Sequence, residues 1–200
     1  MTERRVLVVP SRVVKSAPGM QLLTEDERDT LFGLIDHWGF WGDKKEAETN
    51  TNFQQVIPCI VFMTRKGVPV FKRVLPTGEP RLKDQLTVTA AGHVEAEDGD
   101  RPMEAFYRAM VREAMEETPY LWSNVLSPPE FIGVIKMGGD GVSGVHMGLV
   151  HIALVEIDRN PRGSEELEFM GYIRTVEHAE DFGLLEEWSR VIIEHLPHVT

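Results

Sequence analysis

The chain has 200 residues, of which 42% are hydrophobic, and a formal net charge of −11. This size and composition predict a single globular domain over residues 1–200, in which residues 1–54 form a strand–helix extension. So acidic a chain is not expected to bind a nucleic-acid polymer, because such a surface needs clustered Lys and Arg. No apolar run approaches the roughly 18 residues that cross a bilayer, so we expect no membrane span and a cytoplasmic location.

The first elements are expected to be a strand and then a helix. Residues 4–14 are rich in Val and predict a strand. Residues 23–42 predict a helix, because Thr24 and Glu27 have the spacing of a capping box ahead of an apolar run. Residues 42–54 are polar without periodicity and predict a loop.

Two apolar runs within residues 56–75 flank Lys66-Gly67, and this arrangement predicts a β-hairpin. The only cysteine of the chain, Cys59, lies in the first of these runs. We therefore expect a buried thiol with a structural role.

The second half is expected to place one helix among several strands. Pro102 suits the first turn of a helix, and Pro119 would end it, so residues 102–117 predict a helix. Its core-facing stripe is expected to contain Met103, Phe106, Tyr107, Met110 and Ala114. Strands are expected at 86–94, 131–137, 144–158 and 167–176, and a closing amphipathic helix at 184–196 with Leu184, Leu185, Trp188, Val191, Ile192 and Leu196 on its apolar side. Strands outnumber the interspersed helices, which indicates the α+β class with a mixed sheet.

The end of the central helix gathers one arginine, Arg112, and three glutamates, Glu113, Glu116 and Glu117, which we call the box glutamates. Positions three and four apart are neighbours on a helix, so the three carboxylates share one face and repel each other unless a cation lies among them. Mg²⁺ prefers such oxygen ligands, and an arginine can hold one carboxylate by two hydrogen bonds. The alternative interpretation is a solvated acidic face, which is the commoner origin of this pattern.

From Glu104 onward the chain resembles the motif of the Nudix hydrolase family: Glu, seven residues, Arg-Glu, an apolar residue, any residue, Glu-Glu. Two features differ from the motif. Pro119 stands in place of its last glycine, and eleven residues rather than five separate Gly92 from Glu104. The resemblance extends to the flanking strands and covers most of residues 55–197. It implies the Nudix fold, a mixed-sheet α/β/α sandwich.

The resemblance implies a Mg²⁺-dependent hydrolase, with Mn²⁺ as an alternative ion, that cleaves a diphosphate bond in a nucleotide or nucleoside diphosphate derivative by attack of water on phosphorus. The general base would be a box glutamate or a glutamate of residues 159–169, where Glu168 is preferred over Glu165 and Glu166; a solvated acidic loop is the alternative there. The expected metal ligands are Glu113, Glu116, Glu117 and the Gly92 carbonyl. The expected catalytic residues are Glu116, Glu117, Arg112 and Glu168, of which Arg112 orients a glutamate. The expected contacts for substrate phosphate are Lys72, Arg73 and Arg81.

Two other functions fit the same fold. One is a nucleotide sensor that binds without cleaving. The other is an enzyme of the isopentenyl-diphosphate isomerase type, which uses a catalytic cysteine, although Cys59 lacks the expected surrounding motif. The expected partner is a small nucleotide, and a homodimer is compatible with the sequence. The identity of the nucleotide is left open, as is the role of residues 1–54, which could cap the substrate site or make a dimer contact.

Overall fold

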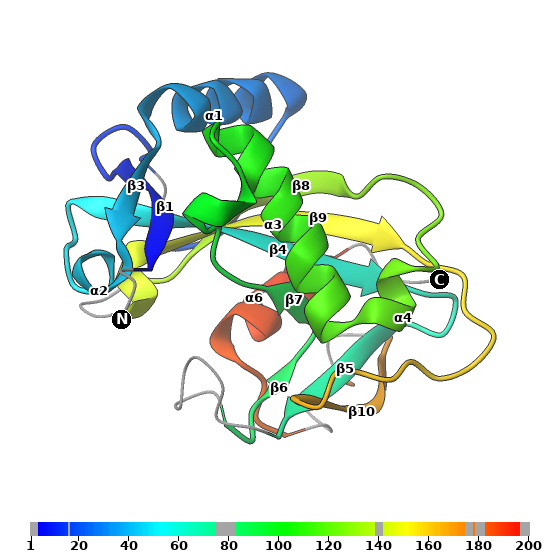
Figure 1. Cartoon of the computed structure of the whole chain (residues 1–200). Coiled ribbons are helices and arrows are strands. Elements are labelled where there is room, and N and C mark those ends of the chain that lie inside the picture. The colour runs from blue at the N-terminus through cyan, green and yellow to red at the C-terminus, as the bar shows by residue number, and fades with distance from the viewer. Residues whose placement is uncertain are drawn as a thin grey trace. The chain divides into compact units, whose positions relative to one another are not determined.

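Helices are interspersed among runs of strands in the structure, a computed structural model that describes residues 4–15, 17–74, 83–138, 142–174, 178 and 183–196 (Figure 1). The strands are β1 (Arg5–Pro10), β2 (Gly19–Leu22), β3 (Phe40–Asp43), β4 (Phe53–Met63), β5 (Val68–Arg73), β6 (Leu86–Thr87), β7 (Thr89–Ala91), β8 (Glu130–Lys136), β9 (His146–Leu154) and β10 (Leu167–Ile173). The helices are α1 (Glu25–Trp38), α2 (Lys44–Ala47), α3 (Pro102–Glu117), α4 (Pro119–Trp122) and α6 (Glu187–His195), with the short 3-10 turns η2 (Ala96–Asp98) and η3 (Val142–Val145). The predicted α+β class is confirmed. None of the helices that the structure describes is long and apolar enough to cross a membrane.

The strands form two sheets. One has seven strands in the order β2-β8-β9-β4-β1-β3, with β7 also paired to β4, and the other has the order β10-β5-β6. β1 is antiparallel to both of its neighbours, β3 and β4. β4 and β9 run in the same direction. At their starts, the Gln54 side chain donates to the Gly144 carbonyl at 3.2 Å, and at their ends, the Val155 amide donates to the Met63 carbonyl at 2.9 Å. The larger sheet is therefore mixed, as expected.

The chain divides into two compact units, each built from three segments. Unit 1 comprises Met1–Cys59, Ala91–Arg112 and Phe131–His151, and unit 2 comprises Ile60–Ala90, Glu113–Glu130 and Ile152–Thr200. The prediction of a single domain over residues 1–200 stays a prediction.

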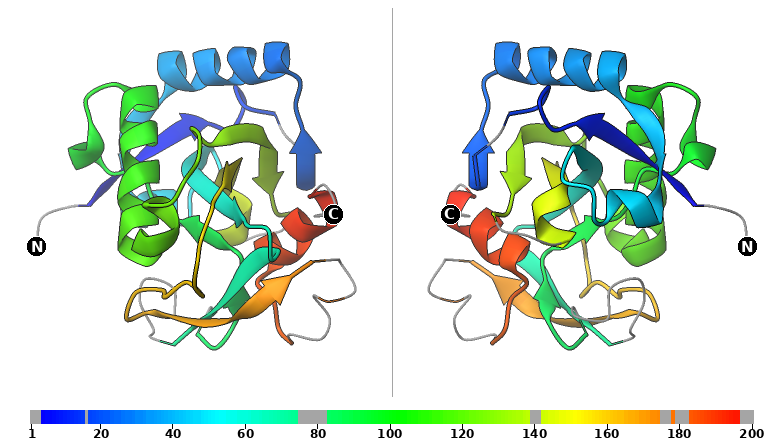
Figure 2. Two further views of the ribbon diagram at one scale, coloured as in Figure 1. Left: turned by 90° about the vertical axis from the view of Figure 1, so that its right-hand side faces the viewer. Right: turned by 90° about the vertical axis from the view of Figure 1, so that its left-hand side faces the viewer.

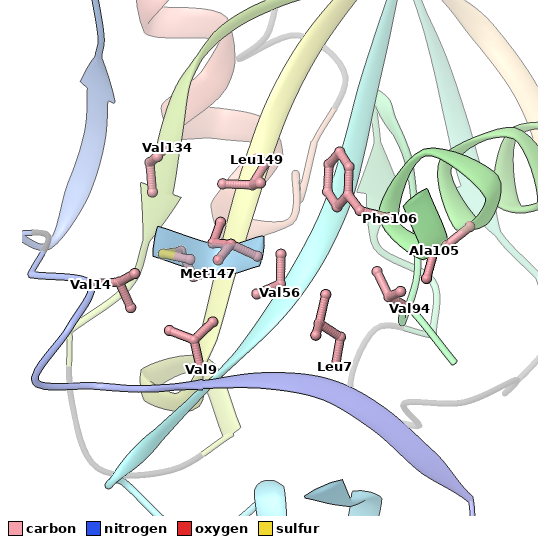
Figure 3. Packing of buried hydrophobic residues seen from close by; sticks show 12 residues of the cluster. Leu7, Val9, Val14, Val56, Val94, Ala105, Phe106, Val134, Met147 and Leu149 are labelled. Carbon is pink, nitrogen blue, oxygen red and sulfur yellow. The ribbon is translucent and has the colours of Figure 1, made fainter. Parts of the chain in front are cut away.

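Unit 1 has a core between its strands and the helices α1 and α3 (Figure 3). α1 begins where predicted, because the Thr24 hydroxyl accepts from the Glu27 amide and the Glu27 carboxylate accepts from the Thr24 amide, which completes the capping box. Ile35 on α1 is fully buried. The other core side chains include Leu7 and Val9 from β1, Val56 from β4, Ala105 and Phe106 from α3, and Met147 and Leu149 from β9.

In unit 2 the strands β10, β5 and β6 lie side by side, and α6 lies next to them (Figure 2). A parallel bridge joins Leu86 to Leu185, just before α6, and the Val88 amide donates to the Ser189 hydroxyl at 3.1 Å. α6 buries Val191, Ile192 and Ile193 among its apolar residues. These contacts hold α6 against the edge of the smaller sheet.

Several local expectations are wrong. Residues 42–54 contain the end of β3, the helix α2 and the start of β4 rather than a loop. The predicted turn at Lys66-Gly67 exists, with Gly67 at φ +121°, and Thr64 and Gly67 pair across it in one antiparallel bridge. The pairing goes no further than this bridge, because β4 and β5 enter different sheets. Tyr107 and Leu184, expected to face the core, are 44% and 70% exposed.

Residues 1–54 are more than an extension. They contribute β1, β2 and β3 to the seven-stranded sheet, and β2 pairs with β8 over Met20 and Ile135. This segment is an integral part of the core of unit 1.

Candidate active site

α3 carries the motif and is held firmly over its first turns. Pro102 is its first residue, as predicted, and the Met103 amide donates to the Asp36 carboxylate on α1 at 3.3 Å. Ala105, Phe106 and Ala109 are fully buried in the core of unit 1. Core packing thus fixes the position of the first turns of the helix that carries the motif.

The box glutamates occupy the end of α3 that belongs to unit 2. Glu113 is half-buried, Glu116 is exposed, and the Glu117 side chain is 12% exposed. The last turn of α3 contains no basic residue. Because the carboxyl end of a helix is the negative end of its dipole, carboxylates there repel both the helix and each other, and a cation nearby would relieve this repulsion.

Arg73, at the end of β5, supplies one such cation. Its Nη1 donates to the Glu117 carboxylate at 3.1 Å, and its Nε donates to the carboxylate of Glu186, just before α6. The Arg73 and Glu186 side chains are only 15% and 8% exposed. Burial lowers the pKa of Arg73, but the carboxylates of Glu186 and Glu117 outweigh it and raise that pKa above its ordinary value. Glu117 is thus held by a guanidinium that stays charged.

The sequence did not reveal Glu186 as part of this group. Arg73 was expected to contact substrate phosphate; the structure instead places it between two carboxylates of the protein itself, and its role toward substrate stays a prediction. No local pattern could identify Glu186, since it is 113 residues from Arg73.

Arg112 makes a two-pronged contact within unit 1. Its Nε and Nη2 each donate to the Asp98 carboxylate at 2.8 Å, and Nη2 also donates to the His93 carbonyl at 2.9 Å. Asp98 in turn accepts from the Glu95 amide at 2.8 Å. Asp98 therefore folds the lengthened segment between Gly92 and Glu104 back onto α3. The predicted contact between Arg112 and a box glutamate stays a prediction.

Asp98 is a second residue that sequence reasoning missed. Its signal was present, since it lies in the acidic segment whose extra length departs from the family motif. The segment is further attached to β1, because the Leu7 amide donates to the Val94 carbonyl at 2.9 Å.

Gly92 follows β7 and precedes His93. Burial, together with the charges of Lys44 and other nearby cations, lowers the pKa of His93 to about 3, so its imidazole is neutral at physiological pH. Its Nε2 lies 3.3 Å from Nε2 of His146. Gly92 belongs to unit 1 and the box glutamates to unit 2, and its carbonyl as a metal ligand stays a prediction.

The remaining predicted residues lie on the smaller sheet of unit 2 or outside the described residues. Lys72 on β5 is directly opposite Glu168 on β10, and Lys72 Nζ lies 3.0 Å from the Asp84 carboxylate. Glu168 is exposed. Ser164, four residues before Glu168, donates its amide to the Glu117 carbonyl at 2.9 Å, so the loop before β10 touches the end of α3. Arg81 lies outside the described residues.

Within those described residues, no three His, Cys, Asp or Glu side chains are gathered closely enough to hold a metal ion as they stand. A hollow of about 470 Å³ lies in unit 1 between α1, β2 and residues 12–15, and none of the predicted site residues lines it. The metal ion and its ligand set stay predictions.

Comparison with known proteins places the chain in a family. No family model matches it. Protein YmaB of Bacillus subtilis (strain 168) is 23% identical over 154 residues, which are 76% of this chain and 75% of that protein. The crystal structure of Tm1382, described as a candidate Nudix hydrolase, has 26% sequence identity and a TM-score of 0.75, and the match covers 95% of this chain and 96% of that one. The NUDIX domain of Shewanella oneidensis NrtR, complexed with ADP ribose, is 14% identical with a TM-score of 0.49 over 70% of this chain and 84% of that one, which is too distant to carry an argument. The nearly full-length match to Tm1382, together with the motif on α3, shows that this chain is a Nudix family protein with the Nudix fold.

Proposed function

We propose that the protein is a Mg²⁺-dependent Nudix hydrolase, for which Mn²⁺ could substitute, and that it cleaves a diphosphate bond in a nucleotide or nucleoside diphosphate derivative. One observation carries the proposal: the box glutamates occupy the end of α3 with the spacing of the family motif, on a helix turn without a basic residue. Three carboxylates at the negative end of a helix repel the helix dipole and each other, and a divalent ion bound among them would relieve this repulsion.

The donor set fits a hard divalent ion. Carboxylate oxygens are the ligands that Mg²⁺ prefers, and the box glutamates would hold the ion. When bound, the ion would neutralise charge on the phosphate oxygens and make water easier to deprotonate.

The protein's own residues would have distinct tasks. Arg73 holds Glu117 in one orientation by its hydrogen bond of 3.1 Å. Glu168 is the proposed general base, which would take the proton of the attacking water, and Lys72 on the neighbouring strand would contact a phosphate oxygen. Glu165 and Glu166 are the alternatives to Glu168, since they lie nearer along the chain to Ser164, which contacts Glu117.

A second function has one observation in its favour. The ion pair between Arg73 and Glu117 already balances the charge of one proposed metal ligand, which suits a Nudix-fold module that binds a nucleotide without cleaving it. The isomerase alternative is not favoured, because Cys59 on β4 is fully buried, as a structural thiol would be.

The deciding experiment measures phosphate or nucleotide release from a panel of nucleoside diphosphate derivatives with Mg²⁺, with Mn²⁺ and with EDTA. Glu116→Gln is run in parallel, because it removes a charge from an exposed side chain while preserving its shape. Hydrolysis that needs the ion and is lost in the variant would support the enzyme. Tight nucleotide binding by calorimetry without hydrolysis of any compound would favour the binding module, and equal rates for Glu116→Gln would exclude that residue from the site.

A further inference from the structure

The β9–β10 loop (residues 155–166) is held at three points in unit 2. The Tyr120 hydroxyl donates to the Asp158 carboxylate at 2.6 Å, the Tyr172 hydroxyl to the Asn160 side-chain oxygen at 3.3 Å, and the Ser164 amide to the Glu117 carbonyl at 2.9 Å. A surface loop with this many contacts has a defined conformation. It runs from the aromatic ring of Tyr120 to the last residue of α3.

This loop carries two arginines, Arg159 and Arg162, and both are exposed. The Arg159 guanidinium lies over the Tyr120 ring, 4.6 Å from its centroid. Neither arginine forms an ion pair with a carboxylate in the part of the chain that the structure describes. Lys72 and Arg73, in contrast, are both paired with carboxylates of the protein.

The chemistry of a stacked arginine suggests what it binds. A guanidinium is flat and delocalised, and when one face rests on an aromatic ring the other face can stack on a nucleobase. Arg162 comes two residues before Ser164, whose amide contacts the carbonyl of Glu117. A guanidinium there can pair with a phosphate oxygen, which would otherwise be repelled by a chain of net charge −11.

We propose that the β9–β10 loop recognises the substrate: Arg159, stacked on Tyr120, contacts the nucleobase, and Arg162 binds a phosphate group next to it. The inference rests on the proposed function for the identity of the scissile bond, and it assigns recognition of the base and of a neighbouring phosphate group to two arginines of this loop. A diphosphate without a base would lack the contact with Arg159.

The test is a calorimetric binding measurement on the full chain with Mg²⁺, comparing AMP with ribose 5-phosphate, which lacks the base. Arg159→Lys keeps the charge and removes the flat surface, so it should raise the Kd for AMP by about 5- to 50-fold and leave the Kd for ribose 5-phosphate nearly unchanged. Arg162→Gln should weaken both ligands to a similar degree. Arg190→Lys is the matched control, because this exposed arginine lies on α6 in the same unit and pairs with Glu194.

Two results would overturn the inference: equal AMP affinity in wild type and Arg159→Lys, or wild-type binding of AMP no tighter than that of ribose 5-phosphate. The outcome is separate from the test of hydrolysis. If no compound is hydrolysed but AMP binding depends on Arg159, the proposed enzyme fails and the recognition loop stands. If hydrolysis is found and the Arg159 dependence is absent, the recognition loop fails alone.

Discussion

Replacing Arg73 with Met should lower the free energy of unfolding by about 3–5 kcal/mol, the cost of removing one partner from a buried ion pair. Methionine fills most of the space, but the Glu186 and Glu117 side chains, only 8% and 12% exposed, both lose the guanidinium. Because these carboxylates raise the pKa of Arg73, its charge is present at any pH at which the protein is folded. Urea denaturation at neutral pH, followed by circular dichroism, measures the change.

Two further variants make this prediction specific. Arg190→Met removes an exposed guanidinium that pairs with Glu194, and it should cost less than about 0.5 kcal/mol. Glu186→Gln, added to Arg73→Met, removes a buried charge that has lost this partner and should restore part of the stability. A loss below about 1 kcal/mol in Arg73→Met, or no recovery in the double variant, would refute the argument that Arg73 holds a buried carboxylate pair.

Three other changes test separate parts of the structure. Asp98→Ala should lower the free energy of unfolding in urea by about 2–4 kcal/mol, because Arg112 loses a two-pronged contact. Asp98→Asn should cost less, and equal effects of the two variants would argue against a charged pair. Burial lowers the pKa of His151 to about 4, so between its ordinary value of 6.5 and pH 4 the unfolded chain takes up a proton that the folded chain does not. This difference lowers the free energy of unfolding by up to about 3 kcal/mol as the pH drops from about 6.5 to 4, and it has no effect above about pH 6.5. The free energy of unfolding, measured across this range, should therefore fall less steeply in His151→Leu than in wild type. Cys59→Ala should leave hydrolysis unchanged, because this thiol is buried in β4, and a folded variant without activity would revive the isomerase.

Elements with strong local signals were predictable. The capping box at Thr24 fixes the start of α1, and Pro102 fixes the start of α3, because each acts through residues within one helical turn. α3 ends at Glu117, two residues before Pro119. The motif spacing then identified the helix on which the candidate site depends.

Elements that depend on distant partners were not predictable. β2 has only four residues, and it exists because it pairs with β8, which is more than 100 residues away in the chain. The expected hairpin around Gly67 is limited to one bridge, between Thr64 and Gly67, for the same reason, since β5 pairs with β6 and β10 in another sheet than β4. A local pattern shows that a strand is present, but the choice of its neighbours is made by the whole sheet.

The same limit applies to the charges around the site. The sequence predicts which carboxylates and cations carry the chemistry, and this stays a prediction. The structure shows that Arg73 and Arg112 contact Glu186 and Asp98, which no spacing pointed to. Pairing across long separations depends on burial, and burial is a property of the folded chain.

Glu117 is the residue at which stability and the proposed chemistry compete. Its carboxylate contributes to folding through Arg73, yet as a metal ligand it would have to share its oxygens between a guanidinium and a divalent ion. A carboxylate has about four acceptor positions, so both contacts can coexist if the guanidinium uses one oxygen and the ion another. Arg73 contacts Glu117 through Nη1 and directs its Nε to Glu186, so the guanidinium is shared between two carboxylates. If Glu117 also binds an ion, as proposed, then Arg73→Met should weaken Mg²⁺ binding as well as stability, because the carboxylate loses the group that orients it.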